Sequence, residues 1–118
     1  MDVTYQELDF EGNARLIKVW GELDSAAAER TGKDLDEFVA HQGGTVLLDI
    51  SELSFLSSAG MRVLLIMAKH LHEHAGMLHL VGPNDRVRAV LTISDYISLF
   101  PVHADMDEAV AALSEGGA

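Results

Sequence analysis

The sequence predicts one α/β domain in which a mixed sheet of four to five strands is accompanied by about four helices. Segments of strand periodicity alternate with segments of helical periodicity, and the chain opens with two strand-like segments joined by a turn signal. A nearly unbroken apolar run at 45–50 is typical of a strand buried on both faces. With 118 residues the chain suits a single domain, 1–113, with a frayed tail at 114–118.

The opening segments predict a β-hairpin. Residues 3–10 alternate loosely between apolar and polar types, and a turn signal follows at 11–13. The second strand is expected at 15–20 and is expected to end at Gly21.

A helix is predicted to begin at Asp24 and Ser25, which are preferred N-cap residues, and to run to about Gln42. Gly32 weakens the middle of this helix. Its apolar face is expected to consist of Ala26, Ala27, Leu35, Phe38 and Val39.

The buried strand at 45–50 is expected to lead through a connector at 51–56 into a long helix at 59–75, which Gly76 closes. Two apolar stripes of this helix are expected to lie in the core: Met61, Leu64, Leu65, Ala68 and Leu71 in the first, and Val63, Ile66 and Met67 in the second. Any member of the second stripe that is exposed becomes a candidate partner contact.

The rest of the chain predicts a strand, a helix, a short edge strand and a final helix, at 77–81, 86–93, 101–103 and 106–113. A turn at 82–85 precedes the first of these helices, and Asp105 is the expected N-cap of the last.

Composition limits the possible partners. Nineteen acidic residues against eight lysines and arginines give a net charge of −11, which argues against direct binding to nucleic acid or to an anionic membrane. A protein with a basic or mixed surface is the expected partner. The absence of cysteine and of a signal-peptide pattern at the N-terminus favours the cytoplasm.

Two adjacent serines, Ser57 and Ser58, stand where the long helix begins. The N–H groups of a helix N-terminus accept a hydroxyl cap or a phosphate, and spacing alone favours capping. Catalysis is not expected, because the nucleophile elbow requires Gly two residues before the serine and Leu56 stands there. If the loops at the strand ends converge, Asp24 lies on the same face as Ser58.

A metal site is not expected. His70 and His74 are four residues apart on the long helix, with Glu73 nearby, but such a pair is unspecific. Glycine-rich nucleotide motifs are also missing from the sequence, so no cofactor is expected.

In order along the chain, these residues resemble the STAS family, the anti-sigma factor antagonists and their relatives. The segments that carry the resemblance are 21–24, 46–51, 55–65, 80–83 and 87–91, and they extend over nearly the whole chain. The middle part is the most specific, since it joins a buried strand through a spacer to a Ser-Ser-Ala-Gly helix entry at 57–60.

The resemblance implies a sheet with helices on one side and a role in partner switching. In such a switch the unphosphorylated antagonist binds a serine-kinase anti-sigma factor and frees a sigma factor. Phosphorylation of a serine at the matching position, here Ser58, cancels binding, and a serine/threonine phosphatase resets it. The best-studied members have an acidic residue where this chain has Ser57, so Ser57 is the second choice for the phosphate.

The expected docking residues are Asp24, Ser57, Ser58 and Arg62, although Arg62 is equally compatible with an ordinary solvated position. Three alternatives stay open: a STAS-type module in another signalling cascade, a subunit of a lipid-transport complex, and a nucleotide-binding domain.

Overall fold

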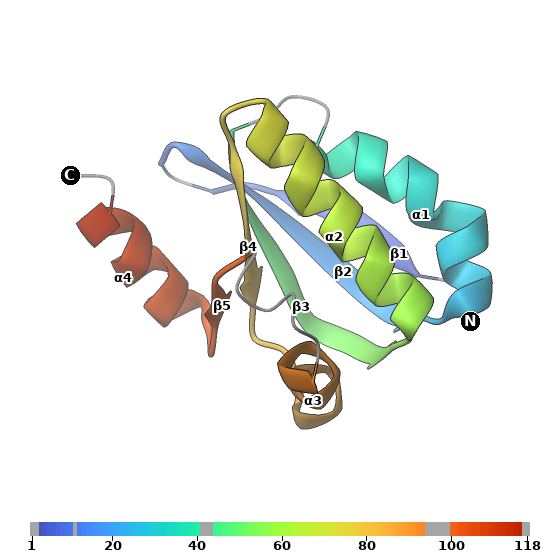
Figure 1. Ribbon diagram of the computed structural model, residues 1–118. Helices are drawn as coiled ribbons and strands as arrows, with labels where there is room; N and C mark the ends of the chain where they lie inside the picture. Colours follow the sequence, from blue (N-terminus) through green and yellow to red (C-terminus); the bar gives the residue numbers. More distant parts are fainter. Residues whose placement is uncertain (1–2, 11, 41–43, 94–99, 117–118) are drawn as a thin grey trace.

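The computed structural model describes residues 3–10, 12–40, 44–93 and 100–116, and Figure 1 shows their arrangement. In chain order the elements are β1 (Thr4–Leu8), β2 (Ala14–Leu23), α1 (Ser25–Ala40), β3 (Thr45–Leu56), α2 (Ser58–Glu73), β4 (Met77–Val81), α3 (Asp85–Ile93), β5 (Val102–His103) and α4 (Met106–Gly116). The expected end of α1 near Gln42 lies outside the described residues. Of the helices in the described ranges, none has the length and apolarity needed to cross a bilayer.

Within these residues the strands form one five-stranded sheet in the order β1-β2-β3-β4-β5. β1 and β2 pair antiparallel as a hairpin, and every later pair is parallel. Parallel neighbours cannot be joined by a tight turn, which is why helices alternate with the strands from β2 onward. The predicted mixed sheet and opening hairpin are therefore confirmed.

β2 and β3 are longer than the sequence predicted. The expected connector at 51–56 is the second half of β3, and it pairs with β2 as far as Leu23 and Leu56. Gly21 does not end β2 but lies at an irregularity in the pairing, with φ of 101°. Glycine adopts such a φ readily, and irregular pairing bends a strand without ending it. Both strands consequently reach the beginnings of α1 and α2.

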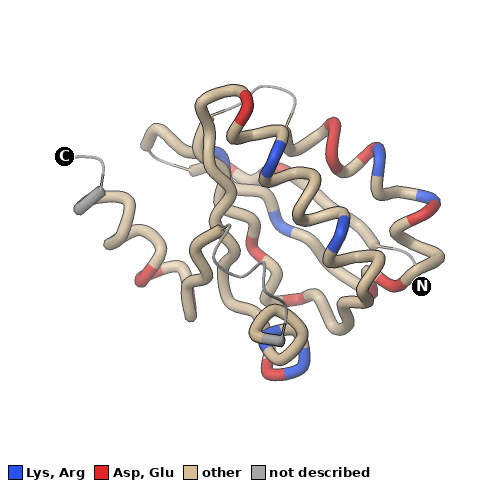
Figure 2. The backbone as a smooth tube through the Cα atoms, in the orientation of Figure 1, with Lys and Arg blue, Asp and Glu red and all other residues tan. Residues whose placement is uncertain are grey.

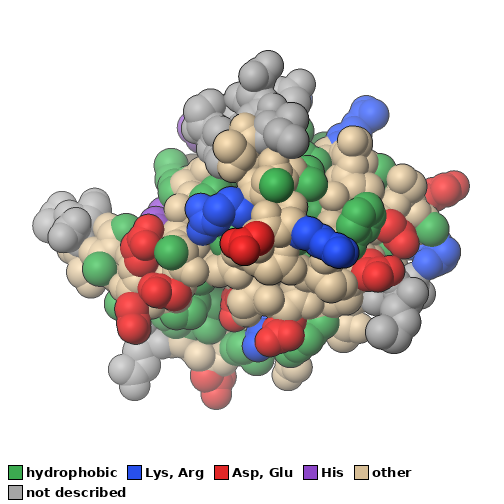
Figure 3. Space-filling model, turned by 90° about the horizontal axis from the view of Figure 1, so that it is seen from below, with side chains coloured by type: hydrophobic (Ala, Val, Ile, Leu, Met, Phe, Trp, Pro, Cys, Tyr) green, Lys and Arg blue, Asp and Glu red, His purple; other side chains and the backbone are tan. Residues whose placement is uncertain are grey.

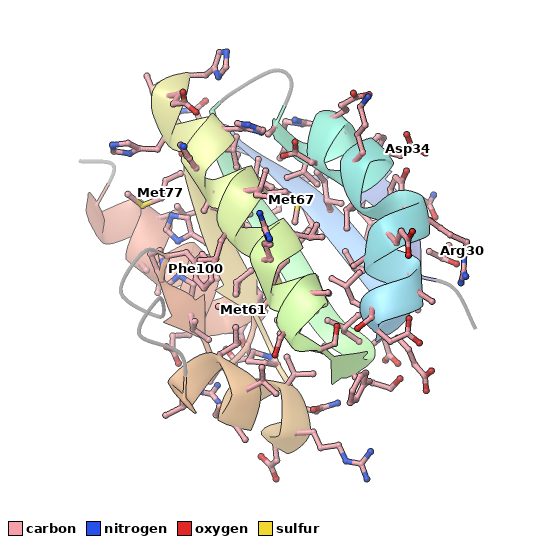
Figure 4. The ribbon with its side chains drawn as sticks, turned by 45° about the vertical axis from the view of Figure 1, so that its right-hand side comes forward. Arg30, Asp34, Met61, Met67, Met77 and Phe100 are labelled. Atoms are coloured by element: carbon pink, nitrogen blue, oxygen red, sulfur yellow. The ribbon has the colours of Figure 1, made fainter. Side chains whose placement is uncertain are left out.

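The main core lies between the sheet and α1, α2 and α3. Figure 4 labels Met61, Met67 and Phe100, whose side chains are 5%, 0% and 2% exposed. They belong to one apolar cluster with residues of β2, β3 and β4, among them Ile17, Leu48, Leu64, Leu71, Leu80, Val87 and Leu91. Val63 and Met67, expected in the core from the second stripe of the long helix, are buried there.

α1 and α2 approach each other closely at Gly32. The sequence predicted a weak point at this glycine, yet α1 continues through it. A Cβ at this position would lie 2.8 Å from Cγ2 of Val63, closer than real Cβ atoms come to a neighbour. The packing of the two helices thus offsets the low helix propensity of glycine.

Two residues expected on the inward face of α1, Ala26 and Phe38, are exposed. The ring of Phe38 packs on Tyr5 of β1, with 5.1 Å between ring centroids. Burial of Tyr5 and, second, the nearby carboxylate of Asp34 raise the pKa of Tyr5. The expected inward residues that are buried are Ala27, Leu35 and Val39.

The opposite face of the sheet is covered by α4, which Figure 1 shows apart from α1 and α2. A small cluster of Leu47, Val81 and Ala109 is enclosed there, bordered by Phe10, Ala14, Leu16, Met106 and Leu113. The expectation that all helices lie on one side is therefore wrong for α4. This helix also continues to Gly116, three residues beyond its predicted end at Leu113.

Gly76 takes part in closing α2, since its N–H donates to the carbonyl oxygen of Leu71 at 2.7 Å, but it is not the residue with positive φ. The helix ends at Glu73, and the positive φ of 59° belongs to Ala75. A Cβ at residue 76 would lie 2.2 Å from the carbonyl oxygen of Gly44. Glycine is therefore required at this position because the turn passes against the backbone that leads into β3.

Candidate functional site

Ser57 is the N-cap of α2, at the end of the sheet where β2 and β3 finish (Figure 1). Its hydroxyl accepts a hydrogen bond from the N–H of Gly60 at 3.0 Å and donates one to the carbonyl oxygen of Leu23 at 3.1 Å. The N–H of Ser57 donates to the same carbonyl at 3.0 Å. The capping role predicted for one of the two serines thus belongs to Ser57, which also ties α2 to β2.

Gly60 brings the first turn of α2 against the end of β2. A Cβ on this residue would lie 2.3 Å from the carbonyl oxygen of Leu23 and 2.9 Å from Cδ1 of Leu56. Any larger residue would push the helix away and break the hydrogen bonds of Ser57. The glycine of the Ser-Ser-Ala-Gly entry therefore fixes the position of the helix N-terminus.

Ser58 is the first residue of α2 and is exposed. Among the described residues, nothing forms a hydrogen bond with its hydroxyl. The two adjacent serines therefore differ in their surroundings: the hydroxyl of Ser57 holds the helix in place, and that of Ser58 faces solvent.

Asp24 and Arg62 lie near this helix N-terminus. Asp24 caps α1, since its carboxylate accepts a hydrogen bond from the N–H of Ala27 at 2.8 Å. It directly follows Leu23, whose carbonyl oxygen binds Ser57, so Asp24 and the serines lie at one end of the sheet. Arg62 is exposed one helical turn beyond Ser58.

Two exposed apolar side chains lie on β3 and α2, the elements that meet at the serines. Phe55, near the end of β3, is 42% exposed, and the sequence did not single it out as a docking residue. Ile66 on α2 is 38% exposed, so its expected place in the core is wrong. Ile66 lies two turns beyond Ser58 on the same side of the helix.

The histidines of α2 do not form a cluster. The Nδ1 atom of His70 contacts both carboxylate oxygens of Asp36 on α1, at 2.8 and 3.0 Å. His74 contacts the carbonyl oxygen of His70 at 2.8 Å. Within the described part of the chain, no three His, Asp or Glu side chains are grouped in a way that could hold a metal ion.

A second pair of histidines is buried on the opposite face of the sheet. Nδ1 of His79 on β4 and Nε2 of His103 on β5 lie 2.9 Å apart, and the two rings stack with 5.2 Å between centroids. Burial, followed by the neighbouring His103, lowers the pKa of His79. Glu108 of α4 approaches the far nitrogen of His103 at 4.0 Å.

Comparison with known proteins places the chain in a family. The sequence pattern of the STAS domain matches residues 5–109. The chain belongs to the STAS domain family. This STAS domain is 39% identical over 92 residues to BtrV of Bordetella bronchiseptica, provisionally named an anti-sigma factor antagonist; the match covers 78% of this chain and 79% of BtrV.

Solved structures of antagonists share the fold of this STAS domain. SpoIIAA in its unphosphorylated form is 25% identical, with a TM-score of 0.71 over 95% of this chain and 97% of that one. Its phosphorylated form, from Bacillus, gives a TM-score of 0.65 at 25% identity over 93% and 99% of the two chains. An antagonist from Mycobacterium paratuberculosis has a TM-score of 0.80 at 22% identity, over 96% and 95%.

Proposed function

We propose that this STAS domain is an anti-sigma factor antagonist that acts in a partner switch in the cytoplasm. In its unphosphorylated form it binds an anti-sigma factor that is also a serine kinase, and a sigma factor is released. Phosphorylation of Ser58 cancels this binding, and a serine/threonine phosphatase restores it. The observation that supports the proposal best is the exposed hydroxyl of Ser58, free of partners among the described residues, at the start of α2.

Ser58 is a better phosphate acceptor than Ser57. A kinase would have to pull the hydroxyl of Ser57 away from Gly60 and Leu23, which costs two hydrogen bonds and loosens the start of α2. Ser58 can receive a phosphate without any such loss. The cap at Ser57 fixes the N-terminus of α2 and so keeps Ser58 on the surface.

A phosphate on Ser58 would change the docking surface and leave the fold intact. It adds a charge of about −1.5 to −2 and three acceptor oxygens next to the N–H groups of the first helical turn. An anti-sigma factor that packs against Ser58 would then have to desolvate this charge. That penalty would oppose binding of the phosphorylated protein.

The four expected docking residues divide into two pairs. Asp24 and Ser57 are partly buried and hold the beginnings of α1 and α2 through hydrogen bonds. Ser58 and Arg62 are exposed. We assign direct contact with the anti-sigma factor to Ser58 and Arg62, and a positioning role to Asp24 and Ser57.

The test is a pull-down from the native host with wild-type protein, Ser58→Ala and Ser58→Asp, followed by mass spectrometry of the proteins and of phosphorylation. Wild type and Ser58→Ala are expected to retain an anti-sigma factor kinase that Ser58→Asp loses, and phosphate is expected on Ser58. Ser57→Asp is the matched control for a negative charge at the neighbouring residue. Recovery of the same proteins by wild type, Ser58→Ala and Ser58→Asp, with no phosphate on either serine, would contradict the switch.

A further inference from the structure

An exposed row of side chains runs along α2 from the candidate phosphorylation site. Ser58, Arg62 and Ile66 are spaced by four residues, so they share one side of the helix and successive members are about 6 Å apart along its axis. We name Ser58, Arg62 and Ile66 the α2 ridge.

The charge of Arg62 is not neutralised within the described part of the protein. None of the ion pairs formed there includes its guanidinium group. The residues three and four positions away on the helix, Ser58, Ala59, Leu65 and Ile66, carry no carboxylate. Arg62 is thus available to an acidic group from outside.

The surroundings of the ridge do not form a uniform basic patch. Figure 2 shows basic residues along α2, with an acidic residue near its far end. On the face seen from α3, Figure 3 shows basic and acidic side chains interspersed. A specific contact to one arginine, and not a general electrostatic attraction, therefore has to select the partner.

We propose that Arg62 is the residue through which phosphorylation is read. In the unphosphorylated protein it binds a carboxylate on the anti-sigma factor, beside an apolar contact made by Ile66. In the phosphorylated protein the phosphate on Ser58, one helical turn away, binds the guanidinium group of Arg62 and prevents it from binding that carboxylate. This inference rests on the proposed function.

Helix geometry and the chemistry of arginine support this competition. Side chains at i and i+4 meet on a helix surface, and arginine forms bidentate hydrogen bonds to phosphate and to carboxylate alike. One guanidinium group cannot satisfy both ligands fully. Phosphorylation would then remove a favourable contact in addition to placing a repulsive charge at the interface. Arginine is also among the residue types that dominate binding energy at protein interfaces.

The first experiment measures the affinity of the unphosphorylated protein for the anti-sigma factor recovered in the pull-down. Arg62→Ala is expected to weaken binding at least tenfold, whereas Arg88→Ala, an exposed arginine on α3, should change it less than twofold. Ile66→Ala should weaken binding at least fivefold, and Val110→Ala, a similarly exposed apolar residue on α4, should not. Equal affinities of Arg62→Ala and wild type would overturn the docking role of Arg62.

The second experiment needs neither the kinase nor the anti-sigma factor. Phosphoserine is introduced at position 58 during translation, and the second pKa of the phosphate is measured by phosphorus NMR in wild type, Arg62→Ala and Arg88→Ala. Capture by Arg62 predicts a lower phosphate pKa in wild type than in Arg62→Ala, with Arg88→Ala resembling wild type. Identical values in all three would overturn the capture.

The two experiments separate the inference from the proposed function. If no anti-sigma factor binds any variant, the proposed function fails and the docking half of the inference fails with it. If the anti-sigma factor binds wild type and Arg62→Ala equally and is released by phosphate, the proposed function stands and the role of Arg62 is wrong.

Discussion

The two faces of the sheet differ in what covers them. On one face, α1, α2 and α3 enclose a continuous apolar core that includes Leu48 of β3 and Leu80 of β4. On the other face, α4 encloses a small cluster around Leu47 and Val81, which alternate with those core residues along the same strands. The buried polar side chains among the described residues, His79 and His103, both belong to this second face.

The difference indicates that the face covered by α1, α2 and α3 is more rigid than the face covered by α4. The helix that carries Ser58 is anchored on the large core and tied to β2 by two hydrogen bonds from Ser57 to the carbonyl oxygen of Leu23. The face under α4 encloses a smaller apolar cluster and two buried histidines. We therefore expect mutations on the first face to affect the docking site and those on the second face to affect mainly α4.

The largest expected effect compares two neighbours on β3. Leu47 and Leu48 are both fully buried, but they face opposite sides of the sheet. Leu48→Ala should lower the free energy of unfolding by about 4 kcal/mol, because the large core cannot collapse around the cavity, and Leu47→Ala by about 2.5 kcal/mol. Urea unfolding measures both. A larger loss of unfolding free energy for Leu47→Ala than for Leu48→Ala would contradict the proposed difference between the faces.

Overpacking under α4 should give the next largest effect. Ala109 is fully buried between α4 and the sheet, so Ala109→Leu should destabilise the protein by about 2 kcal/mol. Ala111 is exposed on the same helix, and Ala111→Leu should change stability by less than about 0.5 kcal/mol. Hydrogen exchange should show faster exchange in α4 of Ala109→Leu while α2 stays protected. Equal loosening of α2 would show that the faces are not independent.

On the first face, we expect a smaller difference in stability between substitutions of the two serines. Ser57→Ala removes the cap of α2 and should cost about 1 kcal/mol. Ser58→Ala removes an exposed hydroxyl and should change stability by less than about 0.5 kcal/mol. Thermal unfolding of both variants measures this difference. A cost for Ser58→Ala as large as that for Ser57→Ala would mean that its hydroxyl has a structural role.

The smallest expected effect is a pH dependence on the second face. Because the pKa of His79 is lowered in the folded protein, the unfolded chain binds the proton more readily. The contribution of His79 to stability is therefore full above pH 6.5 and is lost as pH falls through that value towards the lowered folded pKa. Urea unfolding between pH 7.5 and 5 should show a shallower loss for His79→Asn than for wild type, with the exposed-site variant His72→Asn following wild type.

The sequence was sufficient for the order of elements and for the region of the site. Alternating strand and helix patterns predicted the mixed sheet, and the serine pair marked the start of α2. It could not predict that β3 continues to Leu56, because residues 51–56 mix polar and apolar types and their strand conformation depends on pairing with β2. Nor could the sequence show which of Ser57 and Ser58 caps α2, since the choice of cap is fixed by the distance to the Leu23 carbonyl.

Exposure was the least predictable property. Ile66 has the spacing of a core residue, but it is 38% exposed. The contact of His79 with His103 joins residues 24 positions apart, through strands that pair in the sheet. No local pattern in the sequence reports such a contact.

The close approach at Gly32 also constrains how this protein can diverge. Because a methyl group at residue 32 would collide with Val63, the two positions share one fixed volume. A larger residue at 32 becomes tolerable when residue 63 shrinks, as in a Gly32→Ala, Val63→Ala pair. In homologues, a larger residue at position 32 is therefore expected to occur with a smaller one at position 63. Such correlated variation would reflect the distance between α1 and α2.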